Sequence, residues 1–122
     1  MNSVLIDTSS WITHFQGKNK NLDVILDSAI VFTHEFIIGE FSLGHLKPTH
    51  KNNILQLFQA LKKIPTSAHD DVLDFTLKFK LAGKGIGWLD THLLHSCYVN
   101  KVLLITEDRK LKNISDKILG IL

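Results

Sequence analysis

Four acidic residues stand at positions where a carboxylate is energetically costly. Asp7 closes a short apolar run near the amino terminus, and Asp108 follows a second apolar run near the end of the chain. Glu40 and Asp90 fall on the apolar faces of two predicted helices. A carboxylate turned towards a core is destabilising unless it is paired or binds a cation. Because these four residues lie far apart in the sequence, we expect them to meet in one pocket that holds a divalent metal ion.

Asp7 and Asp108 each have a simpler structural interpretation as helix caps. An aspartate that follows a strand commonly caps the next helix, although the hydroxyl residues at 8–10 could cap it equally well. Asp108 could cap a final helix or pair with Arg109, and Glu107 competes with it for a functional role. The position of Asp7 at a strand end of an α/β pattern favours function over capping, whereas Asp108 carries little information by itself.

Asp90 and Glu40 are harder to explain by structure alone. Asp90 begins a stripe at helical spacing that continues through Leu93, Leu94 and Cys97. The structural alternative is that Asp90 is a first-turn carboxylate stabilised by the helix dipole. Such a residue could be exposed, but the apolar stripe argues against an exposed Asp90. Apolar or small residues surround Glu40 at helical spacing, namely Phe36, Ile37, Leu43 and Gly44. We therefore assign Glu40 to the site and expect Glu35 to be a first-turn partner of the helix dipole.

The expected acid cluster favours a hard divalent cation. Carboxylates brought together without a cation raise one another's pKa values by repulsion, and Mg²⁺ or Mn²⁺ removes that conflict. Such a site can activate a water and neutralise the charge of a phosphodiester. No histidine or cysteine set in the sequence indicates zinc instead. Thr8 and Thr106 stand beside two of the acids and are candidates to orient a water on the metal.

Nearby cations suit a substrate that carries phosphate. Lys84, Arg109 and Lys110 are candidates for a rim that faces phosphate, because each is close in sequence to one of the acids. The net charge of the whole chain is only +2, well below the excess of a sequence-independent DNA binder. If the acids cluster internally, the remaining surface is more basic than this total indicates.

Composition predicts one globular domain spanning residues 1–122. The chain is 44% hydrophobic and 21% charged, which is enough for a core without disulfides. Cys97 is the only cysteine, which excludes an internal disulfide and fits a reducing cytosol. The sequence shows no signal peptide and no stretch long enough to span a bilayer, so we expect a cytoplasmic protein without a membrane partner.

Short apolar runs alternate with amphipathic stretches along the chain, which predicts an α/β fold around a mainly parallel sheet. Expected strands lie at 4–6, 29–32, 63–65, 102–105 and 118–122. Expected helices lie at 8–15, 22–27, 34–46, 53–61, 70–81 and 88–99, with a short one from about 108. In such sheets ligands bind beyond the carboxyl ends of the strands, which is where Asp7 and Asp108 are expected.

The segments around the four acids resemble the ordered motifs of PIN-domain proteins, and most closely those of VapC-type toxins of toxin–antitoxin pairs. These segments are 4–12, 40–44, 84–91 and 104–111, and each contains one of the four acids. The resemblance implies a three-layer α/β/α PIN-like fold and a metal-dependent endoribonuclease with Asp7, Glu40, Asp90 and Asp108 at its centre. It also implies an RNA substrate, a homodimer and inhibition by a cognate antitoxin protein.

Two positions depart from the family pattern. Trp88 and Leu89 precede Asp90, where the family more often has a proline and small residues, and this leaves the choice of substrate open. Lys110 stands where the family often has a further acid, so the sequence does not establish whether this chain has the extra metal contact that such an acid could make. Trp88 is expected to pack against the protein, with stacking on a base as the alternative. Two neighbouring histidines, His92 and His95, are expected at the surface or at an interface.

Other functions are compatible with parts of the sequence. A PIN-like nuclease of RNA processing outside a toxin pair would use the same acids. A non-catalytic PIN-like scaffold for RNA or protein would be expected to have lost acids, and none is lost. A haloacid-dehalogenase-type phosphatase also begins with a strand and an aspartate, but it requires a second aspartate two residues later, where this chain has Ser9.

Overall fold

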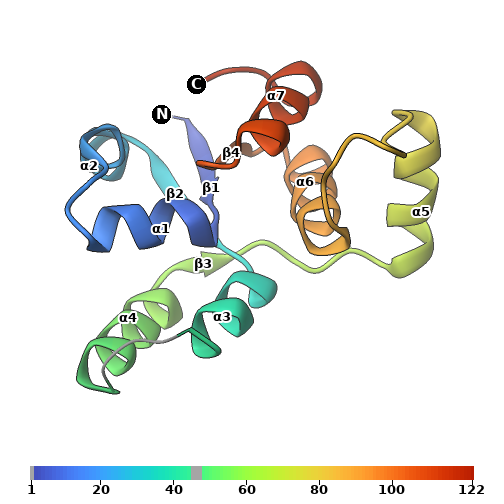
Figure 1. Ribbon diagram of the computed structural model, residues 1–122. Helices are drawn as coiled ribbons and strands as arrows, with labels where there is room; N and C mark the ends of the chain where they lie inside the picture. Colours follow the sequence, from blue (N-terminus) through green and yellow to red (C-terminus); the bar gives the residue numbers. More distant parts are fainter. Residues whose placement is uncertain (1, 45–47) are drawn as a thin grey trace.

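A four-stranded parallel sheet organises the chain in the computed structural model, which describes residues 2–44 and 48–122 (Figure 1). The strand order is β3-β2-β1-β4, and each neighbouring pair is parallel. The strands are β1 (Ser3–Ile6), β2 (Ile30–Thr33), β3 (Lys62–Lys63) and β4 (Leu103–Ile105). The predicted α/β class and parallel sheet are confirmed.

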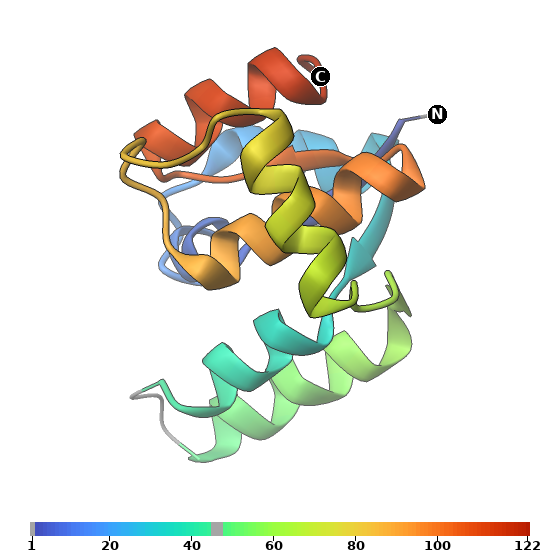
Figure 2. The same ribbon diagram turned by 90° about the vertical axis from the view of Figure 1, so that its right-hand side faces the viewer.

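Helices cover both faces of this sheet. In the described part of the chain they are α1 (Thr8–Phe15), α2 (Lys20–Ser28), α3 (Glu35–Ser42), α4 (Pro48–Ala60), α5 (His69–Lys78), α6 (Trp88–Asn100) and α7 (Arg109–Ile118). Figure 1 shows α1 and α2 on one side of the sheet and α6, with α5 outside it, on the other. Helix α7 packs against β4 and α6, and α3 and α4 form a pair beyond one end of the sheet (Figure 2). The arrangement is the predicted three-layer α/β/α fold.

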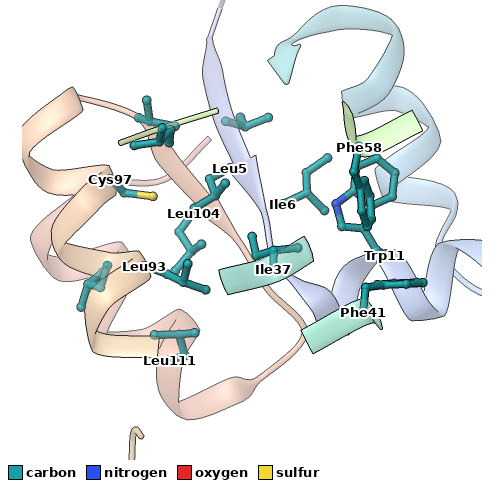
Figure 3. Close-up of a cluster of buried hydrophobic side chains, with 14 of the residues drawn as sticks. Leu5, Ile6, Trp11, Ile37, Phe41, Phe58, Leu93, Cys97, Leu104 and Leu111 are labelled. Atoms are coloured by element: carbon teal, nitrogen blue, oxygen red, sulfur yellow. The ribbon is translucent and has the colours of Figure 1, made fainter. Parts of the chain in front are cut away.

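The central strand β1 is buried on both faces, as expected for a parallel sheet. Val4, Leu5 and Ile6 have no exposed surface. Successive side chains of a strand point to opposite faces, so Leu5 points towards Leu93 and Cys97 of α6, whereas Ile6 points towards Trp11 of α1 (Figure 3). The short apolar run therefore holds both outer layers to the sheet.

An aromatic cluster joins α1 to the α3–α4 pair. The ring of Trp11 lies 5.4 Å from that of Phe58, and Phe58 lies 5.2 Å from Phe41. Phe15 stacks on Trp11 and contacts Phe41 edge-on. Aromatic pairs in these geometries contribute about 0.5–1.5 kcal/mol each beyond their burial. Because α3 packs on α1 through these rings, the cluster sets where α3 places its side chains.

Several predicted boundaries differ from the observed ones. The helix expected from 34 to 46 is α3, which begins after its capping residue His34 and ends at Ser42. Residues 45 and 46 of that prediction lie outside the described residues. Helix α4 begins at Pro48, five residues before the predicted start at 53, because proline fits the first position of a helix. Helix α5 ends at Lys78 rather than 81, since Lys80 adopts a left-handed conformation with φ of 53°.

The predicted final strand at 118–122 is wrong. Ile118 is the last residue of α7, and no strand follows it among the described residues. Gly120 has φ of 104°, a conformation that ends the helix but does not continue as an extended strand. The apolar run near the end of the chain had suggested a strand, but two of its residues, Ile121 and Leu122, are exposed.

None of the helices within residues 2–44 and 48–122 combines the length and the apolar character that crossing a bilayer requires.

The aromatic cluster yields a stability prediction. Phe58→Ala should lower the free energy of unfolding by about 3–5 kcal/mol, because it removes a fully buried ring and leaves a cavity. Leu57→Ala, one position away with 41% of the side chain exposed, should cost less than about 1 kcal/mol. Urea unfolding followed by circular dichroism measures both, and equal losses in the two variants would contradict the role given to the cluster.

Candidate functional site

Asp7 leaves β1 at its carboxyl end and is almost completely buried. Its backbone N–H donates to the carbonyl of Ile105 at 3.0 Å, which continues the ladder between β1 and β4. Its Oδ1 accepts from the backbone N–H of Ser10 at 3.0 Å and from the Ser9 hydroxyl at 2.7 Å. Asp7 therefore caps α1, so its structural interpretation is correct and the hydroxyl residues that could have served as the cap do not take this position. Burial nevertheless raises the pKa of the Asp7 carboxyl above 3.8, and the hydroxyl of Thr106 lowers it in part.

Asp108 occupies the matching position after β4. Its Oδ1 accepts from the backbone N–H of Leu111 at 3.0 Å, so the capping interpretation is correct for Asp108 as well. Its own N–H donates to the Thr106 hydroxyl at 3.1 Å. One carboxylate oxygen of Asp108 is thus committed to α7, and the residue is exposed to solvent.

Ser9 connects the ends of the two strands, a role that the sequence did not reveal. Its single hydroxyl proton is donated to Asp7, and its oxygen accepts from the backbone N–H of Glu107 at 3.0 Å. The hydroxyls of Ser9 and Thr106 lie 3.4 Å apart. Its position two residues after a strand-end aspartate, in a run of three hydroxyl residues, is the sequence signal that could have indicated it. The Glu107 carboxylate accepts a hydrogen bond from the side-chain amide of Asn19 at 2.8 Å.

Glu40 lies in the last turn of α3 and is exposed, which corrects the prediction that it belongs to a buried helical face. The helix ends two residues later at Ser42, and Leu43, expected to share its face, is 84% exposed. The prediction had assumed that helical spacing continues through Leu43 and Gly44, but the helix ends before these residues. The Thr8 hydroxyl donates to Glu40 Oε1 at 3.4 Å, which draws the carboxylate towards α1. Partial burial, and then the charge of Asp7, raise the pKa of Glu40.

Asp90 lies in the first turn of α6 and is partly buried. The stripe predicted for this helix is confirmed, since Leu93, Leu94 and Cys97 are buried beneath it. The pKa of Asp90 rises from 3.8 to about 6, and burial is the largest cause. The remaining causes are the charges of Asp7, Glu40 and Asp108, in that order.

The four acids therefore share one electrostatic environment, although they come from four separate segments. All the causes that act on the pKa of Asp90 raise it, so no neighbouring cation offsets the repulsion. Within the described ranges, no group of three or more His, Cys, Asp or Glu side chains is placed closely enough to hold a metal ion by itself. An oxygen-rich cluster that supplies few direct contacts fits Mg²⁺ or Mn²⁺, which keep several waters in their coordination shell.

A cation lies against the loop that precedes α6. Gly85 has φ of 82°, and a Cβ placed on it would lie 2.8 Å from Cδ of Lys110. The Lys110 side chain therefore lies across the Gly85 backbone, where a larger residue would displace it. Lys84 in the same loop and Arg109 at the start of α7 are exposed. Of the predicted rim, the structure thus brings Lys110 against the loop that leads to Asp90.

His34 is a second residue that sequence reasoning missed. Its Nδ1 accepts from the backbone N–H of Phe36 at 3.0 Å and so caps α3, and Ser96 of α6 lies 3.3 Å from its Nε2. Burial lowers the pKa of His34 to about 4, so the ring is neutral at pH 7 and can accept. His34 thereby links the helix of Glu40 to the helix of Asp90. Its place directly before a helix start was the available signal, but histidine is an uncommon cap.

Comparison with known proteins matches both the fold and the order of these segments. The family model for the PIN domain matches residues 4–117. Ribonuclease VapC32 from Mycobacterium tuberculosis, in strains CDC 1551 / Oshkosh and ATCC 25618 / H37Rv, is 34% identical over 110 residues. That alignment covers 89% of this chain and 87% of the relative.

A solved structure agrees with the fold. The crystal structure of PAE2754 from Pyrobaculum aerophilum matches with a TM-score of 0.62 over 93% of this chain and 85% of that chain, at 15% identity. At this identity the likeness shows the fold alone. The resemblance found in the sequence motifs is confirmed by the family model and the VapC32 alignment together. The chain belongs to the PIN-domain family and is a relative of its VapC-type members.

Proposed function

We propose that this chain is a divalent-metal-dependent endoribonuclease and the toxin of a type II toxin–antitoxin pair. The proposed metal ligands and catalytic residues are Asp7, Glu40, Asp90 and Asp108. The observation that carries the proposal is geometric: Asp7 and Asp108 follow the neighbouring parallel strands β1 and β4, and Thr8, next to Asp7, donates to Glu40. In keeping with this arrangement, burial and then the charges of the three other carboxylates raise the pKa of Asp90. Uncompensated acids gathered beyond the carboxyl ends of parallel strands are expected where a cation is part of the working site.

The donor set favours a hard cation over zinc. Carboxylate oxygens are the preferred ligands of Mg²⁺ and Mn²⁺, and the lone cysteine, Cys97, is buried in the core with a pKa raised by that burial. A bound ion of this kind would supply charge neutralisation at a phosphodiester and an activated water. Asp7 and Asp108 use Oδ1 for helix caps, and Oδ2 of each carboxylate takes no part in the cap.

Hydroxyl groups hold these acids in place. Thr8 donates to Glu40, and the Thr106 hydroxyl contacts the backbone of Asp108 and lowers the pKa of Asp7. Both threonines therefore orient acids of the proposed site, and groups in this outer position commonly change metal affinity or activity by about 10- to 100-fold.

An RNA substrate is proposed from the printed name of the VapC32 relative, a ribonuclease, and from the cations around the acids. Lys110 lies across Gly85, and Lys84 and Arg109 are exposed nearby in sequence. We expect these side chains to face phosphate oxygens of the substrate. Without them, the acid cluster would repel a polyanion.

Protein partners are proposed from the same relationship. A VapC-type toxin is expected to form a homodimer and to be held inactive by a cognate antitoxin in the cytoplasm. Exposed apolar side chains on α1, on α4 and just after the end of α3 are of the kind that protein partners cover, namely Ile12, Phe15, Leu43 and Leu57.

RNA cleavage tests the proposed chemistry. Purified total RNA incubated with the protein and Mg²⁺ should be cut at discrete sites, and EDTA should abolish cutting. Asp7→Asn and Asp90→Asn should each lower the rate at least about 100-fold, the order lost when one preorganised charge-stabilising group is removed. Asn retains the Oδ1 acceptor, so Asp7→Asn keeps the cap on α1. Sequencing of the new 5′ ends reads the outcome.

A matched pair of glutamates on α3 controls this experiment. Glu40→Gln should reduce cutting in the same way, whereas Glu35→Gln, in the exposed first turn of the same helix, should not. The proposal fails if Asp7→Asn and Asp90→Asn cut RNA as fast as the parent. A parent that binds RNA without cutting it would indicate a scaffold.

The pKa of Asp90 predicts a pH-dependent stability of the metal-free protein. Its folded value of about 6 lies above the ordinary 3.8, so the folded state holds the proton more tightly than the unfolded state. Stability is therefore lost as pH rises from about 4 through about 6. In EDTA at about pH 7.5, Asp90→Asn should raise the free energy of unfolding by about 1–2 kcal/mol, with little effect at about pH 4.

Metal addition provides the second half of the test. Millimolar Mg²⁺ should stabilise the parent more than Asp90→Asn, since a ligand stabilises only the state that binds it. Asp74→Asn, an exposed acid of α5, should show neither effect. Urea unfolding at the two pH values measures these differences, and identical profiles for the parent and Asp90→Asn would contradict the proposed cluster.

A further inference from the structure

Two histidines of α6 that were predicted at the surface are buried, so that prediction is wrong. His92 is 6% exposed and His95 is 8% exposed. The ring of His92 meets Trp88 edge-on at 4.9 Å, and the packing expected for Trp88 is met in part, because Trp88 stays 39% exposed. His95 has different neighbours: its ring meets Phe75 of α5 edge-on at 5.1 Å, and its Nδ1 lies 2.6 Å from the Ser67 hydroxyl.

A chain of hydroxyl and imidazole groups runs from His95 to α3. From the Ser67 hydroxyl it continues to the Ser96 hydroxyl at 3.2 Å, and from there to Nε2 of His34 at 3.3 Å. The other ring nitrogen of His34 accepts from the backbone N–H of Phe36 at 3.0 Å and so caps α3. Ser96 and His34 have no exposed surface, so water cannot replace a lost partner of either side chain without rearrangement. The chain therefore joins the segment before α5, helix α6 and the first turn of α3.

The cap of α3 fixes the direction in which the protons of this chain point. A backbone N–H can only donate, so Nδ1 of His34 carries no proton and the neutral ring carries its proton on Nε2. Burial lowers the pKa of His34 to about 4, which keeps this ring neutral at neutral pH. Nε2–H therefore donates to Ser96. Within the described residues the Ser96 hydroxyl has one further partner, Ser67, so its own proton points there, and the Ser67 proton points to Nδ1 of His95.

A proton on Nδ1 of His95 is incompatible with this direction. Protonated His95 has to donate to Ser67, and Ser67 then donates to Ser96. The Ser96 hydroxyl in that case accepts from two donors, and its own proton has no acceptor among the described contacts. The alternative is that the His34 proton moves from Nε2 to Nδ1, which removes the cap of α3. Either outcome is costly, because a buried donor or a helix end is left unpaired.

Charged groups around the two histidines act on their pKa values but do not set this direction. Burial lowers the pKa of His95 below 6.5, and the charge of Asp71 offsets this in part. The titratable groups that face His95 come from α5 and α6 and are Asp71, Asp74, Lys78, His92 and Tyr98. For the pKa of His34, burial is again the largest cause, followed by Glu35, which raises it, and His92, which lowers it. Both rings are therefore neutral near neutral pH, the state that the chain requires.

Helix α3 depends on its cap more than a longer helix would. It has eight residues, a length at which a helix is not stable by itself. Phe41 packs on Phe15 of α1 and holds the last turn, whereas the His34 cap holds the first. The contact of Glu40 with the Thr8 hydroxyl is long, at 3.4 Å, so the helix rather than this contact sets where Glu40 lies.

We propose that Ser96 and Ser67 are positioning residues, which hold His34 as the cap of α3 through this directed chain and so keep Glu40 in place. The step from α3 to Glu40 rests on the proposed function, whereas the chain itself does not. The chain also couples the cap to the charge of His95, and such a coupling acts in both directions. Loss of Ser96 eases the protonation of His95, and protonation of His95 loosens the start of α3.

Histidine titration followed by NMR tests the chain in the metal-free protein. With ¹⁵N-labelled histidine, the parent should show the protons of His34 and His95 on Nε2 near neutral pH. Ser96→Ala should raise the pKa of His95, because Ser67 is then free to accept from protonated Nδ1. In a Ser67→Ala background the same substitution should leave the pKa of His95 unchanged, since the link is already cut. In a Ser67→Thr background, which keeps the hydroxyl, the rise should return.

Amide hydrogen exchange tests the cap. The N–H of Phe36 should exchange about 2- to 30-fold faster in Ser96→Ala, the fold-change that corresponds to the loss of one helix cap. The N–H of Lys112, which donates to the carbonyl of Asp108 in α7, should exchange as in the parent. Ser115→Ala is the matched control, because Ser115 is buried in a helix but its hydroxyl has no hydrogen-bond partner among the described residues. This control should change neither the exchange of Phe36 nor the histidine titration.

RNA cutting tests the step from α3 to Glu40. At limiting Mg²⁺, Ser96→Ala should cut RNA about 2- to 30-fold more slowly, because the loss of one cap limits the effect. In a Glu40→Gln background, Ser96→Ala should cause no further loss, since it acts through Glu40. Ser115→Ala should cut RNA like the parent.

The outcomes distinguish this proposal from the proposed function. A proton on Nδ1 of His34 or His95 in the parent would overturn the direction of the chain without any variant. An unchanged pKa of His95 in Ser96→Ala, or equally faster exchange of Phe36 and Lys112, would also overturn it, the latter because it indicates general destabilisation. Normal RNA cutting by Ser96→Ala beside the expected pKa shift would overturn the role given to the two serines. If the parent cuts no RNA, the proposed function fails, while titration and exchange still decide the chain.

Discussion

The position of β1 between β2 and β4 is the constraint on which the rest of the structure depends. Because the three strands are parallel, their carboxyl ends lie at the same edge of the sheet. From β1 the chain adds β2 and β3 on one side of β1 and then adds β4 on the other side, so the strand order changes direction at β1. Asp7 leaves the sheet at this point, and its N–H still bonds to Ile105 of β4. Asp108 follows β4, and the helix after β2 carries Glu40. The topology therefore gathers acids that are distant in sequence.

Two of these acids have a structural role in addition to the chemical role proposed for them. Asp7 and Asp108 each cap a helix with Oδ1, a contact that fixes the carboxylate and leaves its other oxygen outside the cap. A cap and a ligand are thus not competing interpretations, because a carboxylate has two oxygens. The Ser9 hydroxyl, shared between Asp7 and the backbone of Glu107, ties the two caps together. The pKa of Asp90 is raised by burial and then by the charges of Asp7, Glu40 and Asp108.

Contacts between helices, outside the sheet, set the positions of the helices that carry Glu40 and Asp90. The rings of Trp11, Phe41 and Phe58 hold α3 against α1, where Thr8 reaches Glu40. On the other side, His34 caps α3 and lies within hydrogen-bond distance of Ser96 in α6. The rings thus fix α3, which carries Glu40, on α1, and the second contact joins α3 to α6, which carries Asp90.

The sequence by itself determined the α/β class, the parallel sheet and the buried stripe beneath Asp90, and it singled out the four acids, whose role in a site stays a prediction. These follow from local periodicity and from motif order, which need no knowledge of distant contacts. Only the tertiary structure decided that α3 stops at Ser42, that Glu40 is exposed and that no strand follows α7. Helix ends depend on caps and packing partners from other segments, such as His34 and the aromatic cluster, and spacing within one segment does not contain them. The shared electrostatics of the acids and the exposure of Trp88 are likewise properties of the folded chain, because burial and charge proximity exist only between segments brought together.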